Sequence, residues 1–297
     1  MAESPRPSAA ARRGSGSGEA SSVEEVLADE LVEEILVRLP IDDPSCLARA
    51  GPGFRRRFGE LHRRPPLLGH LLDTDGDDES CLSQFVPTDP FRAPAVDLDF
   101  WRAIDSRHGR VLLNRVPERF GPFQDDLRVW NPVTDMVLEL PKLPRCPNMQ
   151  SWSAAVLCAG GACDHVVCHR ARGPFRVVFA GTDKLGIFFC VYSSATSAWS
   201  ERAYFVDPHG HDELESMPPP LLGNALYFHF QISASILRYD LGGRGMSIVR
   251  RPPACSSFHG RVVLVNMENG GSLGFAYLYD STLYLWSREM VQSSSHG

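Results

Sequence analysis

The stretch that decides how this chain is organised is LADELVEEILVRLP, residues 27–40. Large apolar residues recur in it at steps of three and four, and the set is Leu27, Leu31, Val32, Ile35, Leu36 and Leu39. Residues at these steps lie on one side of a helix, so the spacing predicts an amphipathic helix with one apolar face. Pro40 follows the pattern and ends the helix, because proline cannot continue the hydrogen-bond ladder.

The start of this helix is marked upstream. Ser22 and Glu25 have the spacing of a capping box, in which each side chain bonds a free backbone amide of the first turn. Acidic residues occupy the first turns and Arg38 lies in the last, as the helix dipole favours. We therefore expect one continuous helix over residues 23–39.

The residue order L-x-D-E-L-x-x-E-I-L-x-R-L-P, followed by a short acidic turn and a second helix, resembles the F-box. The resemblance covers residues 24–62. This sequence departs from the family at two places. Ala28 stands where the family usually has proline, and Gly51-Pro52-Gly53 interrupts the place where the family runs an apolar helix.

A short third helix is expected after this interruption. Phe54, Phe58 and Leu61 have the spacing to face the same small core. The arginines at 55–57 make this end of the segment basic. They predict a solvated helix face leading into a linker, and contact with an acidic partner is the alternative.

The F-box resemblance implies a partner and a function. The helices would bind a Skp-type adaptor and, through it, a cullin. The resemblance implies burial against the helices' own core and the partner's apolar groove for Leu27, Leu31, Ile35, Leu36, Leu39 and Pro40. The chain would then be a substrate-receptor subunit of an SCF-type ubiquitin ligase. It would hold a target protein near the ubiquitin-loaded enzyme and would perform no bond chemistry itself.

The second half of the chain has a different pattern. From about residue 85, prolines are frequent and short apolar runs alternate with turn residues. Four phrases each read as a strand, a polar turn and a second strand: LRVWNPVTDMVLELP (127–141), FFCVYSSATSAWSE (188–201), SILRYDLGGRGMSIVRRPP (235–253) and FAYLYDSTLYLWSRE (275–289). A repeat of about 50 residues with about four strands is typical of β-propeller blades. Trp130, Trp199 and Trp286 would pack between neighbouring blades.

These phrases, in this order, also resemble the β-propeller-type domain that follows the F-box in many plant, especially grass, F-box proteins. The resemblance runs from about Leu67 to Glu289. Four units are fewer than such propellers usually have, so we expect an incomplete propeller, with divergent early blades in residues 80–125.

The expected fold class is α+β multidomain, a small helical F-box followed by an all-β, propeller-like domain. The expected boundaries are a disordered tail at 1–22, the F-box helical domain at 23–64, a linker at 65–84, the β domain at 85–290 and a disordered tail at 291–297.

Composition narrows the function classes. The chain has 297 residues and a formal net charge of −6, which gives no reason to expect nucleic acid as a partner. No apolar run is long enough to span a membrane, and the first residues do not resemble a secretory signal. We therefore expect a cytoplasmic or nuclear protein with no membrane partner, whose eight cysteines are mostly free thiols.

Two groups of residues could hold a metal ion. The cluster Cys158, Cys163, His165, Cys168 and His169 has zinc-ligand residue types, but its spacing matches no standard finger and its context reads as strand–turn–strand. Asp73, Asp75 and Asp77 begin like a calcium loop, but Asp78 and Gln84 stand where glycine and glutamate are needed. The expectation is therefore no metal and no cofactor.

No catalytic constellation emerges from the sequence, and we expect no enzyme activity. Gly270 to Gly274 fit G-x-S-x-G, but a nucleophile elbow needs a following helix, whereas the residues after Ser272 alternate like a strand. Two alternatives to the ligase subunit stay open. One is a propeller-type enzyme or sugar-binding module, and the other is a degenerate F-box protein that no longer engages the ligase.

Overall fold

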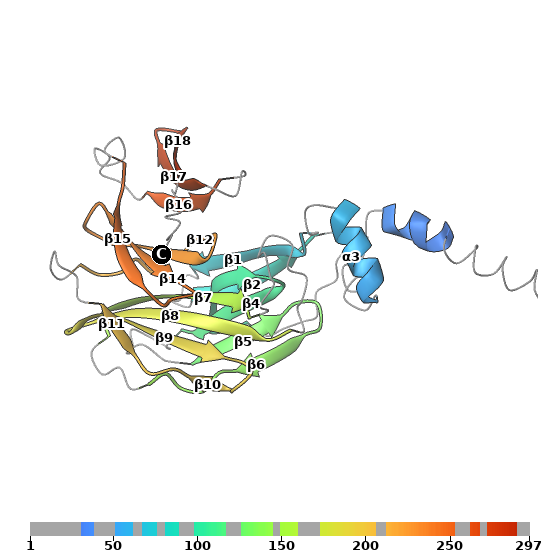
Figure 1. Ribbon diagram of the computed structural model, residues 1–297, viewed down its shortest axis with the longest axis horizontal. Coiled ribbons are helices and arrows are strands. Elements are labelled where there is room, and N and C mark those ends of the chain that lie inside the picture. Colours follow the sequence, from blue (N-terminus) through green and yellow to red (C-terminus); the bar gives the residue numbers. More distant parts are fainter. Residues whose placement is uncertain are drawn as a thin grey trace, which may run out of the picture. The chain divides into compact units, whose positions relative to one another are not determined.

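The computed structural model describes residues 31–38, 51–61, 67–75, 81–88, 98–116, 126–144, 149–159, 173–205, 212–252, 262–267 and 272–289. The chain divides into two compact units, Met1–Pro66 and Leu67–Gly297 (Figure 1). The first unit is helical where it is described and the second is built from strands. None of the described helices is long and apolar enough to cross a membrane.

The first unit contains helical residues 31–38 and helix α3 (Pro52–Leu61). Residues 31–38 fall inside the helix predicted at 23–39, and the rest of that prediction lies outside the described residues. Helix α3 is the expected third helix, in which Phe58 is buried as predicted but Leu61 is 54% exposed. Pro52 begins it, and proline suits the first helical position because the backbone amide there has no partner within the helix. Phe54 and Phe58 stack one turn apart, with 6.3 Å between ring centroids.

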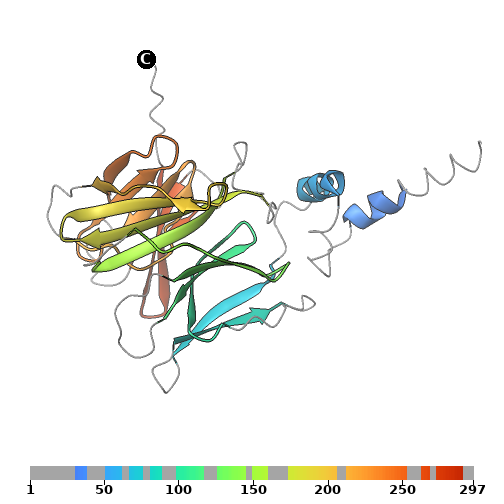
Figure 2. The ribbon, with the colours of Figure 1, turned by 90° about the horizontal axis from the view of Figure 1, so that it is seen from below.

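The second unit contains four antiparallel meander sheets arranged like propeller blades (Figure 2). Sheet 1 has β3 (Trp101–Arg107), β4 (Arg110–Arg115), β5 (Leu127–Asn131) and β6 (Met136–Glu139). Sheet 2 has β7 (Ser151–Cys158), β8 (Phe175–Asp183) and β9 (Gly186–Ser193), with β10 (Ala198–Trp199) and β11 (Ala203–Phe205) both paired to β9. Sheet 3 has β12 (Leu221–Leu222), β13 (Ala225–His229), β14 (Ser235–Asp240) and β15 (Met246–Arg250). Sheet 4 has β16 (Val263–Asn266), β17 (Ser272–Tyr279) and β18 (Thr282–Glu289).

The predicted strand–turn–strand phrases are confirmed as the pairs β5–β6, β9–β10, β14–β15 and β17–β18. The expectation of four strands in every blade is not met. Sheet 2 has five strands, and sheet 4 has three among the residues that the structure describes. The β17–β18 turn shows why the turns were recognisable. Asp280 and Ser281 both have positive φ, which two-residue hairpin turns require and which aspartate tolerates.

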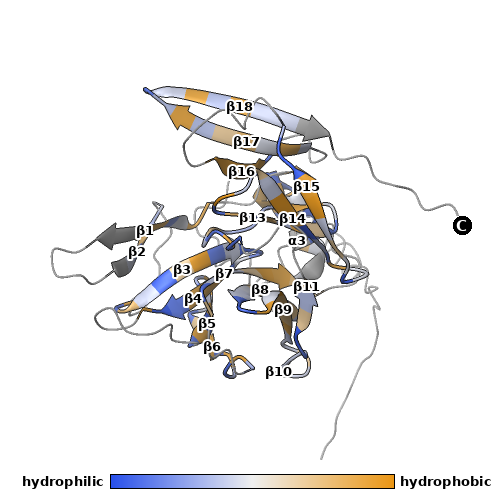
Figure 3. Ribbon diagram, turned by 90° about the vertical axis from the view of Figure 1, so that its left-hand side faces the viewer, coloured by the Kyte–Doolittle hydropathy of each residue, from blue (hydrophilic) through white to orange (hydrophobic). Residues whose placement is uncertain are grey.

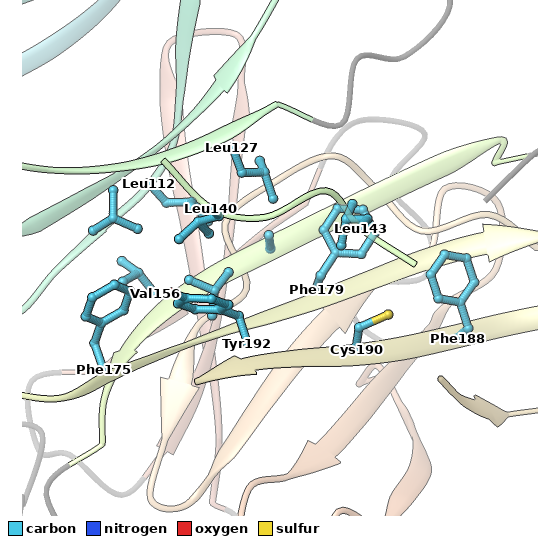
Figure 4. Packing of buried hydrophobic residues seen from close by; sticks show 13 residues of the cluster. Leu112, Leu127, Leu140, Leu143, Val156, Phe175, Phe179, Phe188, Cys190 and Tyr192 are labelled. Atoms are coloured by element: carbon cyan, nitrogen blue, oxygen red, sulfur yellow. The ribbon is translucent and has the colours of Figure 1, made fainter. Parts of the chain in front are cut away.

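Successive sheets pack face to face through three apolar clusters. The cluster between sheets 1 and 2 contains Leu112 and Leu127 on one side and Val156, Phe179 and Tyr192 on the other (Figure 4). A second cluster joins sheets 2 and 3, and a third joins sheets 3 and 4. Burial of apolar area between sheets is the main stabilising term, at roughly 25 cal/mol per Å² removed from water.

Of the three tryptophans predicted to pack between neighbouring blades, Trp199 and Trp286 do so and Trp130 does not. Trp199 packs edge-on against Phe179 in the cluster between sheets 1 and 2, and Trp286 packs against the cluster between sheets 3 and 4. Trp130 is fully buried on the other face of sheet 1, edge-on to Phe85 with 5.4 Å between ring centroids.

Phe85 belongs to a hairpin that was not predicted from the sequence. Residues 65–84 were expected to be a linker, but β1 (Gly69–Asp75) pairs along its whole length with β2 (Cys81–Pro87). The hairpin packs on sheet 1 through Leu71 and Phe85, and the amide of Ala103 donates a hydrogen bond to Ser83 Oγ at 3.0 Å. The compact β unit therefore begins at Leu67 rather than at residue 85.

Candidate functional site

The apolar face of the first helix is the candidate interaction site. Leu31, Ile35 and Leu36 are among the residues predicted to bind an adaptor, and their side chains are 64%, 59% and 49% exposed. The other predicted contact residues, Leu27, Leu39 and Pro40, lie outside the described residues. Where the structure describes it, this face is therefore open, and the expectation that these side chains also pack on the helices' own core is not met.

The same helix buries its other side within the first unit. Val37 is fully buried, and Glu33 and Glu34 both pair with Arg57 of α3, the Glu33 contact at 3.3 Å. Arg38 also pairs with Glu34, one turn away, at 2.7 Å. The sequence predicts a solvated basic face for Arg57, and the contact with Glu33 and Glu34 shows that this prediction is wrong for Arg57. The charged side of the helix thus holds the unit together and leaves the apolar side outward.

A second candidate site, which is polar, lies deep in the β unit, where three sheets meet. Asp105 is almost fully buried in β3, next to a β-bulge that shifts the pairing between Ala103 and Asp105. A bulge re-aims the side chains beside it. Asp105 Oδ2 accepts a hydrogen bond from the backbone amide of Val156 in β7 at 2.9 Å. Its Oδ1 lies 3.3 Å from Arg107 Nε.

Arg107 extends this junction to sheet 3. Its Nη2 donates to the carbonyl oxygen of Pro219, just before β12. Nearby, Ser153 Oγ of β7 donates to the carbonyl oxygen of Met217 at 2.7 Å. Side chains from sheets 1 and 2 thus hold the backbone that leads into sheet 3. No sequence motif marks this junction. The only local signal is an aspartate within a strand-like run.

Burial raises the pKa of Asp105 from its ordinary value of 3.8 to about 6, against the opposing effects of Arg107 and the Val156 amide. A carboxyl group with such a pKa could serve as a general acid or base. Here, however, both oxygens already contact protein groups and the side chain is almost inaccessible. The arrangement therefore suits a structural tie between blades.

His229 and Glu215 form another buried pair, with 3.1 Å between Nδ1 and Oε2. Burial and, to a smaller extent, the nearby Arg251 lower the pKa of His229 below its ordinary value, and Glu215 offsets only part of this effect. The pair lies beside β13, where the Glu215 amide also donates to the His229 carbonyl oxygen at 2.8 Å. It fastens the segment before sheet 3 to that sheet.

The sequence-level metal and nucleophile candidates are only partly described. Cys158 is buried at the end of β7, whereas Cys163, His165, Cys168 and His169 lie outside the described residues. Asp73 and Asp75 are paired in β1, so the start of the calcium-like segment is strand. Within the described part of the chain, no group of three or more metal-ligating side chains comes together.

Ser272 begins β17 and is followed by strand, not by the helix that a nucleophile elbow requires. The G-x-S-x-G match therefore lacks the local structure of a nucleophile elbow, and Ser272 lies in a strand rather than in the expected turn.

Comparisons with known proteins add little to this picture. No family model matches the chain, and no curated protein matches it. Similar solved structures include a chain of the mitotic checkpoint complex, with a TM-score of 0.37 and 12% identity over 66% of this chain and 49% of that chain. A KlHsv2 variant with loop 6CD replaced by a Gly-Ser linker has a TM-score of 0.32 and 9% identity over 59% of this chain and 44% of that chain.

The extracellular domain of a one-component system from B. thetaiotaomicron has a TM-score of 0.38 and 11% identity over 77% of this chain and 28% of that chain. The matched part of this chain thus spans less than half the length of each of these structures. Likenesses at this level carry no inference about function.

Proposed function

We propose that this chain is a substrate-receptor subunit of an SCF-type ubiquitin ligase. Its first unit would bind a Skp-type adaptor, and through it a cullin, and its β unit would bind a target protein. The observation that carries the proposal is the open apolar face of Leu31, Ile35 and Leu36 on a helix whose charged side is engaged by α3. The F-box-like residue order of the same helix is the reason for proposing a Skp-type adaptor as the partner.

The energetics are consistent with a docking face. Burying a leucine or isoleucine side chain completely stabilises by about 1.5–3 kcal/mol relative to full exposure. Leu31, Ile35 and Leu36 are each about half exposed or more, so a partner groove would gain about 1 kcal/mol or more from each. Leu27, Leu39 and Pro40 would extend the contact if they continue this face.

The departure at Gly51-Pro52-Gly53 does not weigh against this proposal. Pro52 is the first residue of α3, and a Cβ built at Gly51 or Gly53 would meet nothing within 4 Å. The sequence there begins a helix that supplies Arg57, and Arg57 orients the first helix.

The β unit would act without bond chemistry. A ligase subunit accelerates transfer by holding its target close to the reactive enzyme, which raises the effective concentration of the target. The chain would then work in the cytoplasm or the nucleus, where such ligases operate.

The test is a pull-down of the full chain with a purified Skp-type adaptor, repeated with a chain that lacks residues 24–62. The proposal expects the full chain to retain the adaptor and the shortened chain to lose it. Failure of the full chain to bind would support the degenerate alternative. Retention by the shortened chain would place the contact elsewhere.

A further inference from the structure

A short segment before sheet 3, residues 212–217, runs beside the end of β13. The Glu215 amide donates to the His229 carbonyl oxygen at 2.8 Å, and the Gln231 amide donates to the Glu213 carbonyl oxygen at 2.9 Å. This pairing forms an isolated β-bridge rather than a strand. Side-chain contacts therefore matter for how firmly the segment is held.

The segment is tied to other parts of the β unit. The Met217 carbonyl oxygen accepts a hydrogen bond from Ser153 Oγ of sheet 2 at 2.7 Å. The carboxylate of Asp212 accepts hydrogen bonds from the backbone amides of Ile232 and Ser233, at 3.1 and 2.7 Å, and so fixes the β13–β14 loop. Release of the segment would free this loop, in which the Ile232 side chain is 84% exposed, and would loosen the junction between sheets 2 and 3.

His229 is the side chain that fastens the segment. Sheet 3 lies between sheets 2 and 4 (Figure 3). Because side chains alternate along a strand, His229 lies on the side of β13 that faces sheet 4, together with Ala225 and Tyr227. Its ring is 9% exposed, and Nδ1 lies 3.1 Å from Glu215 Oε2. Its Nε2 is buried and has no hydrogen-bond partner among the described residues.

These surroundings favour a neutral ring. An ionised Glu215 carboxylate can only accept, so Nδ1 carries the proton and Nε2 keeps its lone pair. Protonation would place an N–H donor and a positive charge at the buried Nε2, with the guanidinium of Arg251 nearby. Burial has the larger effect and Arg251 the smaller, and together they lower the pKa of His229 from 6.5, although Glu215 offsets part of the change.

Few other charges face the ring. Its cross-strand partner in β14 is the apolar Ile236. The other titratable side chains described on this side of sheet 3, on the bridged segment and in the facing cluster of sheet 4 are Glu213, Tyr227, Arg238, Asp240 and Tyr277. Arg238 and Asp240 pair with each other at 2.9 Å. Among the described residues, the charges that act on the ring are therefore those of Glu215 and Arg251.

We propose that His229 is a pH-sensitive latch, in which the neutral ring holds residues 212–217 on sheet 3 and protonation of the ring releases them. In the open state the ring is in water and takes up a proton with its ordinary pKa of 6.5. Between 6.5 and the lower pKa of the closed state, only the open state binds this proton, so the open fraction rises as the pH falls below 6.5. A fall from about pH 7.5 to about pH 5.5 should raise the opening equilibrium constant by up to about tenfold.

Hydrogen exchange of the full chain, followed by NMR at single amides, tests the latch. Protection of the Glu215 and Gln231 amides, relative to intrinsic exchange at each pH, should fall by up to about tenfold over this pH range. His229→Asn retains a donor near the position of Nδ1 but cannot titrate, so it should lose this pH response. His70→Asn is the matched control, because His70 is exposed on β1. It should respond like the wild type.

Three results would overturn the proposal. One is a pH response that persists in His229→Asn, because another group would then cause it. The second is protection that stays constant or increases on acidification of the wild type, since Glu215 would then outweigh burial and Arg251. The third is a wild-type His229 ring whose NMR signals show protonation at or above pH 6.5 in the folded protein.

His229→Gln provides a second non-titrating variant if His229→Asn does not fold, and circular dichroism melting at neutral pH would confirm that each variant is folded. The ring signals of the wild type test the closed state without any variant. All of these measurements use the chain alone, so their outcomes are independent of adaptor binding.

Discussion

The carboxylate of Asp105 accepts a hydrogen bond from the backbone amide of Val156 at 2.9 Å, and this contact joins sheet 1 to the free edge of β7 in sheet 2. Because Arg107 pairs with the same carboxylate and donates to Pro219, the junction also reaches sheet 3. It links blades through directed bonds in addition to the non-directional packing of the apolar clusters.

Asp105→Ala should therefore destabilise the β unit strongly. It leaves the Val156 amide unsatisfied and the partly buried Arg107 without its carboxylate, and breaking a buried pair typically costs about 3–5 kcal/mol. Urea unfolding followed by tryptophan fluorescence would measure the loss. Glu139→Ala is the matched control, because Glu139 pairs with Arg128 at 2.6 Å but is largely exposed. It should cost about 1 kcal/mol or less, and equal losses in the two variants would contradict the role given to Asp105.

The raised pKa of Asp105 predicts how stability changes with pH. Folded protein binds the proton more readily than unfolded protein between the two pKa values, 3.8 and about 6. This group therefore favours the folded state as the pH falls through that window, and the favourable effect is lost as the pH rises through about 6.

Comparison with Asp105→Asn would isolate this effect from other titrating groups. The free energy of unfolding of the wild type minus that of the variant should increase as the pH falls from 7 to 4, by up to about 3 kcal/mol. A difference that stays constant across these pH values would show that Asp105 titrates normally.

The β1–β2 hairpin should be part of the folded β unit. A shortened chain that begins at Leu67 should unfold cooperatively and bind little hydrophobic dye. A chain that begins at Phe85 lacks β1, so the cluster around Trp130 and Leu113 becomes exposed. Its melting temperature should fall by several degrees, because roughly 4–8 °C corresponds to 1 kcal/mol in a domain of about 100 residues and less in a larger one. Identical melting temperatures of the two chains would indicate that residues 65–84 are a linker, as predicted from the sequence.

Much of the β unit could be predicted from the sequence because its signals are local. Alternating apolar residues and turn residues such as Asp280 mark strands and their hairpins without knowledge of the rest of the chain. The β1–β2 hairpin was missed because Asp73 and Asp75 are poor strand formers, and only pairing with β2 and packing on sheet 1 keep them extended. Tertiary contacts overrode the local preference.

The two candidate sites also differ in how much of each could be predicted from the sequence. The apolar stripe of Leu31, Ile35 and Leu36 follows from helical periodicity, but its exposure depends on where Arg57 binds, which periodicity does not show. Asp105 could not be found from the sequence, because its role depends on a bulge in β3 and on a strand that begins more than forty residues later.

The central claim is that the open helix face binds a Skp-type adaptor, and calorimetric titration of the adaptor into the full chain tests it most directly. The wild type should bind, and Leu36→Asp should raise the dissociation constant about a hundredfold or more, because a buried unpaired carboxylate and the lost apolar contact each oppose association. Ile232→Asp, which changes an exposed apolar residue of the β unit, should leave the affinity unchanged. Absence of wild-type binding, or equal binding by Leu36→Asp, would contradict the account.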